Sequence, residues 1–81
     1  MELSKPRQQV MEAIARISER DSSEVAPGME LVGDLGIDSA DGLLLLIEIE
    51  ELIGLEISDD EAEKLNTVED ILAFVDRSLG D

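Results

Sequence analysis

The chain of 81 residues contains no cysteine, histidine, tyrosine or tryptophan, and Phe74 is its single aromatic residue. Without cysteine, the chain can form neither a disulfide framework nor a thiolate metal site. Without histidine, it can form neither a Ser-His-Asp triad nor an imidazole metal site. General acid–base chemistry near neutral pH would need a carboxylate or a lysine with a strongly shifted pKa. We therefore expect that the chain is not an enzyme and binds no metal at a dedicated site.

Positive charge is also scarce. The sequence has 6 basic against 21 acidic residues, which gives a formal net charge of -15. Such a surface repels nucleic acids and anionic membranes, and it favours partners with basic surfaces. Hydrophobic residues nevertheless make up 43% of the chain and recur periodically, which indicates a folded domain rather than a disordered segment.

Long hydrophobic segments are missing as well. The longest apolar run, Leu43 to Ile47, is far too short to cross a membrane, and the polar N-terminus lacks the apolar region of a signal peptide. No repeat or linker divides the sequence. We expect a single domain over residues 1–81, in a monomeric cytoplasmic protein without membrane insertion.

Helical periodicity predicts the two longest helices. The first begins near Ser4 as N-cap, ends around residues 19–21 and has its core positions at Leu3, Val10, Met11, Ile14 and Ile17. The second runs from Ser39 to Ile53 and ends at Gly54. Its predicted core face consists of Leu43, Leu46, Ile49 and Ile53, with Leu45 and Leu52 on the flanks.

Capping patterns predict two further helices. Ser58 to Glu61 fits a capping box that opens a short helix through about Leu65. Thr67 is the expected N-cap of the last helix, whose core positions are Val68, Ile71, Leu72, Val75 and Leu79, while Phe74 is left unassigned. The predicted fold is an all-α four-helix bundle of three main helices and one short helix, with a long loop between the first and second helices.

That loop, from Ser22 to Asp38, carries Pro27 and three glycines. Connections of this length are uncommon in compact domains and are usually functional. We expect five apolar residues to attach it to the helices, namely Val25, Met29, Leu31, Leu35 and Ile37. Its last residues deliver Ser39 to the start of the second helix.

Ser39 has two interpretations at this position. Its hydroxyl can cap the helix, or it can be an exposed attachment point for a phosphate that the helix N-terminus stabilises. A calcium-binding EF-hand loop beginning at Asp34 is excluded, because it would place Gly36, Ser39 and Leu45 at positions reserved for a ligand, a glycine and a glutamate.

Three segments resemble the acyl carrier protein family. Residues 35–39, Leu-Gly-Ile-Asp-Ser, resemble its attachment motif, residues 50–59 resemble the end of its second helix and the following turn, and residues 67–71 resemble the start of its last helix. The resemblance is close from about Leu31 to Val75 and looser over Leu3 to Ile17.

The resemblance implies that Ser39 carries a 4′-phosphopantetheine arm, installed from coenzyme A by a phosphopantetheinyl transferase. The terminal thiol of the arm would hold acyl groups as thioesters for acyl-processing or acyl-loading enzymes, so a chain without cysteine can perform thiol chemistry. Asp38 would support the site by orienting the turn and helping the transferase to recognise it. The bundle would shelter the carried chain between its helices.

The sequence departs from the family pattern beside the serine. Ala40 replaces the usual leucine, Gly42 stands in the next turn, and Leu44 replaces a usual exposed glutamate. The predicted partner-recognition face consists of Ala40, Asp41, Leu44, Ile47, Glu48 and Glu51, with Glu50 adding to its acidic character. This face suggests partners other than the housekeeping fatty-acid enzymes. An aminoacyl or peptidyl type of carrier and an unmodified acidic helical adaptor remain as alternative functions.

Overall fold

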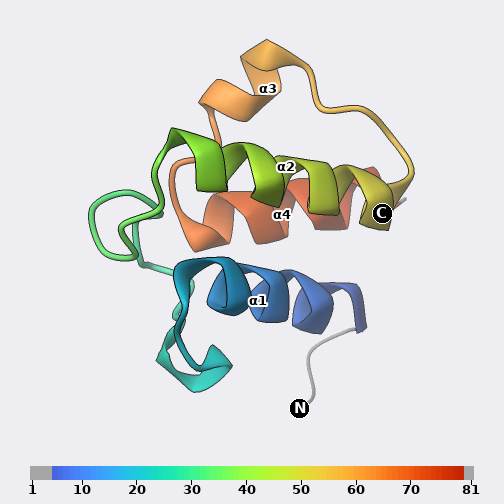
Figure 1. Cartoon of the computed structure of the whole chain (residues 1–81). Coiled ribbons are helices and arrows are strands. Elements are labelled where there is room, and N and C mark those ends of the chain that lie inside the picture. The colour runs from blue at the N-terminus through green and yellow to red at the C-terminus, as the bar shows by residue number, and fades with distance from the viewer. Residues whose placement is uncertain (1–4, 80–81) are drawn as a thin grey trace.

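The computed structural model describes residues 5–79 and contains α1 (Lys5–Ser18), a short 3₁₀ turn η1 (Ser22–Glu24), α2 (Ser39–Ile53), α3 (Asp59–Glu63) and α4 (Val68–Ser78) (Figure 1). This confirms the predicted all-α fold with one short helix. Within residues 5–79 there is no β-strand, only an isolated bridge between Glu30 and Thr67. The predicted cap Ser4 and the predicted core residue Leu3 lie outside the described residues.

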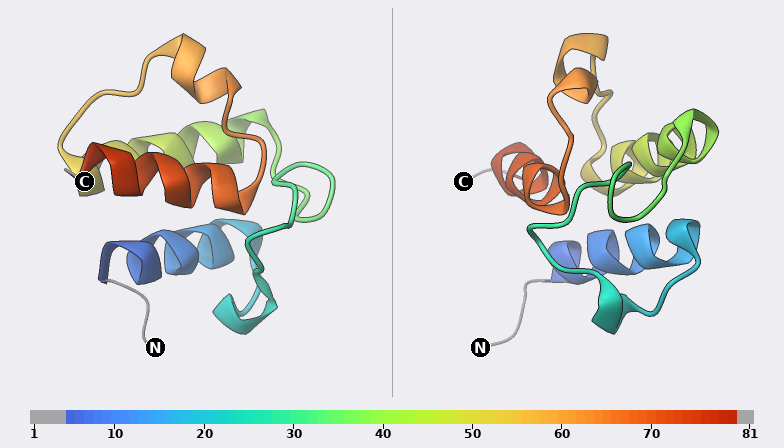
Figure 2. Two further views of the ribbon diagram at one scale, coloured as in Figure 1. Left: turned by 180° about the vertical axis from the view of Figure 1, so that it is seen from behind. Right: turned by 90° about the vertical axis from the view of Figure 1, so that its left-hand side faces the viewer.

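The helices α1, α2 and α4 pack against one another, whereas α3 lies on the side of α2 and α4 away from α1 (Figures 1 and 2). Burying one aliphatic side chain stabilises a fold by about 1.5–3 kcal/mol, so the shared core is the main source of stability. Its most buried large members are Val10, Ile14, Leu45, Ile49, Val68, Ile71, Leu72 and Val75.

The helix ends follow local chemistry. At the end of α1 the N–H of Arg20 donates to the carbonyl of Ala15 at 2.8 Å, and Glu19 adopts a φ of 60°. Gly54, as predicted, ends α2 with a φ of 74°. Thr67 and Asp70 form a reciprocal capping box at the start of α4, while α3 ends at Glu63, before the predicted Leu65.

Three predicted core positions are wrong. Leu43 is 60% exposed, Leu79 is 43% exposed, and Leu46 is half-buried outside the shared core. The buried stripe of α2 consists of Leu45, Ile49 and Ile53, so Leu45 belongs to the core rather than to a flank, and Leu43 and Leu46 lie off the stripe. Leu79 follows the last residue of α4 and so lies past the packed part of that helix. Phe74, by contrast, is buried in the core.

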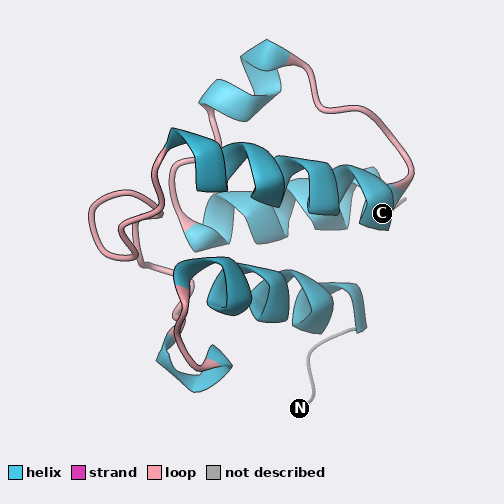
Figure 3. Ribbon diagram, viewed as in Figure 1, coloured by secondary structure: helices cyan, strands magenta, loops and turns pink. Residues whose placement is uncertain are grey.

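The loop from α1 to α2, drawn in pink in Figure 3, is attached to the bundle by buried side chains and by backbone hydrogen bonds. Four of its apolar residues are buried as predicted (Val25, Leu31, Leu35 and Ile37), and Met29 packs against the core. The N–H of Leu31 donates to the carbonyl of Asn66 at 3.0 Å, and the N–H of Val68 donates to that of Met29 at 3.0 Å. These bonds fix the loop against the segment before α4.

Candidate functional site

The N-cap of α2 is Asp38. Its backbone is extended, and its side-chain Oδ1 accepts a hydrogen bond from the N–H of Asp41 at 2.8 Å. The carbonyl of Asp38 accepts the N–H of Gly42 at 2.8 Å, which begins the hydrogen bonding of the helix. The capping role that a serine can take at a helix start is therefore filled by Asp38, and Ser39 is the first helical residue.

The hydroxyl of Ser39 is exposed, and among residues 5–79 no group forms a hydrogen bond with it. The turn that delivers it is fixed by its neighbours: Gly36 has a φ of 66°, and the N–H of the buried Ile37 donates to the carbonyl of Leu31 at 2.9 Å. The first N–H groups of a helix and its dipole favour a negatively charged phosphate. The site therefore presents a free hydroxyl where a phosphodiester is stabilised.

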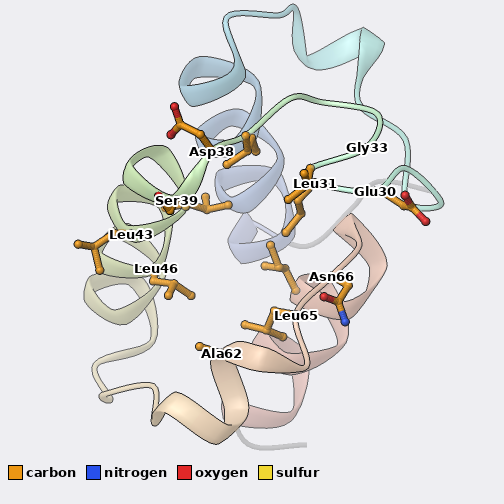
Figure 4. Close-up of a pocket in the computed structure, with 15 residues that line it drawn as sticks. Glu30, Leu31, Gly33, Asp38, Ser39, Leu43, Leu46, Ala62, Leu65 and Asn66 are labelled. Atoms are coloured by element: carbon orange, nitrogen blue, oxygen red, sulfur yellow. The ribbon is translucent and has the colours of Figure 1, made fainter.

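A groove of about 720 Å³ opens beside Ser39, between α2, α3 and the long loop. Figure 4 shows Ser39 and Leu46 along α2, with Ala62 and Leu65 across from Leu46 on α3 and the residues after it, whereas the side chain of Leu43 lies at the outer edge and points away from α3. Leu31 joins the wall from the loop, whereas Glu30 and Asn66 lie on the side away from Ser39 (Figure 4). Sequence patterns did not place Gly42, Leu43 and Leu46 at a ligand site. Residues at this spacing on a helix can form either the wall of a groove or part of a buried core stripe.

Some residues of the predicted recognition face are exposed, whereas two of the carboxylates on α2 already bond to another part of the chain. Ala40 and Glu51 are exposed, and Leu44 and Ile47 are 54% and 44% exposed, so these residues form an accessible surface with an apolar centre. Glu48 forms an ion pair with Arg16 of α1, which raises the pKa of that arginine.

Glu50 is also occupied, because its carboxylate accepts the N–H of Ile57 at 2.8 Å and so fixes the turn after α2. Within residues 5–79, Asp41 and Glu51 have no comparable side-chain partner. Only these two carboxylates of α2 are therefore available to a partner without breaking an internal contact.

Two other kinds of site find no support in the part of the chain that the structure describes. No group of three or more acidic side chains is placed to hold a metal ion there. Likewise, none of the helices within residues 5–79 has both the length and the apolar character needed to span a membrane.

Comparison with known proteins agrees with this geometry. Residues 8–75 match the family described as "Phosphopantetheine attachment site". The class of the protein is thus a carrier domain, whose cofactor is a covalently bound 4′-phosphopantetheine arm.

Three similar proteins indicate which kind of carrier domain this is. The chain is 39% identical over 61 residues to the acyl carrier protein of Solidesulfovibrio magneticus, covering 75% of this chain and 78% of that protein. It is 42% identical over 59 residues to the acyl carrier protein of Thermosynechococcus vestitus, covering 73% of each. It is 41% identical over 56 residues to that of Helicobacter hepaticus, covering 69% of this chain and 74% of that protein. The chain belongs to the acyl carrier protein family.

Proposed function

We propose that the protein holds acyl intermediates as thioesters on a 4′-phosphopantetheine arm attached to Ser39, and presents them to enzymes of fatty-acid or specialised lipid biosynthesis. The observation that supports this most directly is the free, exposed hydroxyl of Ser39 beside the cap residue Asp38. An attachment serine has to be accessible to a transferase, and the Ser39 hydroxyl is both exposed and free of a capping hydrogen bond.

The attachment reaction forms a bond between Ser39 Oγ and the phosphate of coenzyme A that bears the pantetheine, and it breaks the pyrophosphate linkage, so that 3′,5′-adenosine bisphosphate leaves and the arm is held as a phosphodiester. The chain has no histidine, and the carboxylate of Asp38 is engaged with the N–H of Asp41. The base that removes the proton from Ser39 therefore belongs to the transferase. What this chain contributes is the fixed position of the hydroxyl and a helix N-terminus that stabilises the phosphate.

The groove beside Ser39 is the proposed shelter for the carried chain. Its wall on the α3 side is weakly attached: no residue of α3 is buried, and Glu61 lies 3.8 Å from Arg77, which is a loose and exposed ion pair. The flanking Ile57 and Leu65 are only partly buried against the core. A segment with so few buried contacts opens at low cost, so α3 can move aside to admit a chain.

The recognition face of α2 is the proposed docking surface for the transferase and the acyl-processing enzymes. Its apolar centre, Ala40, Leu44 and Ile47, is bordered by the carboxylates of Asp41 and Glu51. This arrangement fits partners that combine an apolar contact with a basic rim. A second copy of the chain is a poor occupant because two molecules of net charge -15 repel each other, and we propose a monomer.

Intact-mass measurement tests the proposal. The apo-protein is incubated with coenzyme A and a promiscuous phosphopantetheinyl transferase, with Ser39→Ala as the control. We expect a gain of one phosphopantetheine in the wild type and none in the control, which should fold normally because Ser39 makes no side-chain hydrogen bond within residues 5–79. No gain with several transferases would instead favour the unmodified adaptor.

A further inference from the structure

Gly42 is a helical glycine that the backbone of α2 does not require. Its φ is not among the positive values, which within residues 5–79 belong to Gly36, Gly54 and Glu19. A Cβ placed on Gly42 would lie 3.9 Å from Cγ2 of Ile37, an ordinary contact, with no other close neighbour within 4 Å. Glycine inside a helix costs about 1 kcal/mol relative to alanine. The fold would thus be more stable with a side chain at this position.

The groove supplies a reason for the missing side chain. Gly42 lines the groove one helical turn after Ser39, so an acyl group that the arm folds back into this end of the groove passes it. Ile37, the only neighbour of the added Cβ, lines the groove as well. A side chain longer than alanine at position 42 would therefore extend into the groove rather than into the core. Ala62, on the facing wall, is also small (Figure 4).

The groove has room for a ring. A dry apolar cavity of about 150 Å³ is enough to hold a benzene molecule. The groove, at about 720 Å³, is several times larger and falls within the range of pockets that take whole small molecules. Its wall beside Ser39 is apolar, from Ile37, Leu43 and Leu46, and this favours an apolar group.

We infer that Gly42 is a determinant of cargo specificity, because it keeps the groove wide enough next to Ser39 to admit a branched or ring-containing acyl group. This inference rests on the proposed function, because the cargo reaches the groove only if Ser39 bears the arm. A straight chain passes a leucine at position 42, whereas a wide group does not.

The test uses two probes and three variants. The transferase loads hexanoyl and phenylbutanoyl groups from their coenzyme A thioesters onto the wild type and onto Gly42→Ala, Gly42→Leu and Gly28→Leu. Gly28→Leu is the matched control, since it makes the same exchange at a glycine that neither lines the groove nor belongs to the recognition face, and where an added Cβ meets no atom within 4 Å. The rate at which hydroxylamine cleaves each thioester, relative to the free acyl-pantetheine, reports how well the protein shelters the group.

In the wild type we expect the phenylbutanoyl thioester to be cleaved several-fold more slowly than the free compound. Gly42→Leu should lose this protection while keeping that of the hexanoyl thioester, and Gly42→Ala and Gly28→Leu should behave as the wild type. Equal effects of Gly42→Leu on both probes, or no protection of the phenylbutanoyl group in the wild type, would overturn the inference. Intact mass after loading separates this result from a failure of the proposed function, which would show as no modification of any variant with Ser39 intact.

Thermal unfolding of the unloaded variants completes the test. Gly42→Leu should be at least as stable as the wild type, because leucine is a better helix former than glycine. A loss of protection in a variant that remains folded then reports on the width of the groove. A Gly42→Leu variant that is clearly less stable would contradict the claim that its side chain points into the groove.

Discussion

The Oδ1 atom of Asp38 accepts a hydrogen bond from the backbone N–H of Asp41 at 2.8 Å, so the aspartate caps α2 in place of the serine that follows it. The residue that caps the helix and the residue proposed to carry the arm are therefore different, although they are adjacent. Asp38 accepts the hydrogen bond at the start of the helix, and Ser39 keeps its hydroxyl exposed, as the proposed modification requires. The proposed attachment chemistry thus needs no rearrangement of the helix start.

Substitutions at Asp38 should separate its two roles. Asp38→Ala removes the cap and should lower the free energy of unfolding by about 1 kcal/mol, while Asp38→Asn, whose amide oxygen also accepts, should leave it nearly unchanged. Urea denaturation measures both. If the transferase recognises the charge, Asp38→Asn will still be modified more slowly than the wild type. An Asp38→Ala variant as stable as the wild type would contradict the capping role.

Gly36 and Gly28 form a matched pair of positions at which alanine substitution measures the cost of a left-handed backbone. Gly36 has a φ of 66°, whereas a Cβ on either glycine would meet no atom within 4 Å. Gly36→Ala should therefore destabilise the protein by about 1 kcal/mol through the left-handed backbone alone. Gly28→Ala should have almost no effect, or stabilise the protein slightly. Similar unfolding midpoints for the two variants would show that the turn before Asp38 is not strained.

Asp70 should make the free energy of unfolding depend on pH in the acidic range. Hydrogen bonds from the backbone N–H groups of Asn66 and Thr67, each 3.0 Å long, lower the pKa of its carboxyl below the ordinary 3.8. Because the pKa is lower in the folded state, this carboxylate contributes stability above pH 3.8, which is lost as the pH falls through the folded-state value.

The comparison of Asp70→Asn with Asp60→Asn isolates this effect, because both remove one negative charge and Asp60 is exposed. Urea denaturation at pH values from about 7 down to about 3 should show Asp70→Asn less stable than Asp60→Asn near neutral pH, with the difference shrinking in acid. A difference that stays constant with pH would mean that ionisation of Asp70 is not the cause.

The recognition face should change partners when its apolar centre is altered. Ala40→Leu with Leu44→Glu restores the pattern usual in the family while leaving the groove residues unchanged. We expect the double variant to gain in kcat/KM with housekeeping fatty-acid enzymes and to become more sensitive to salt, because charged contacts are screened and apolar ones are not. The measurement is kcat/KM over a set of acyl-processing enzymes at two salt concentrations. If the double variant and the wild type have the same preferences among these enzymes, positions 40 and 44 do not determine partner choice.

Much of the fold followed from local signals. The caps at Thr67 and Ser58 and the glycine at the end of α2 act through hydrogen bonds between near neighbours in sequence, so their patterns predicted the helix ends well. The buried loop residues were predicted because isolated apolar side chains in a long polar connection have to be covered. The spacing of the attachment motif placed Ser39 correctly at the start of α2.

The wrong or missing predictions concern features that depend on how the helices pack against one another. An apolar run from Leu43 to Ile47 is compatible with several buried stripes, and only the positions of α1 and α4 select the one through Leu45. The free hydroxyl of Ser39 and the ion pair of Glu48 with Arg16 likewise depend on which neighbour reaches which atom. The groove requires the separation of α3 from α2, which no sequence pattern here encodes.

Locating the modified residue by fragmentation mass spectrometry tests the central claim most directly. The wild-type protein is treated with coenzyme A and the transferase, digested with trypsin, and the peptide between Arg20 and Lys64 is sequenced. Its serines are Ser22, Ser23, Ser39 and Ser58, so the peptide contains its own controls. We predict one phosphopantetheine on Ser39 and none on the others. An arm on any other serine, or an unmodified peptide, would contradict the account.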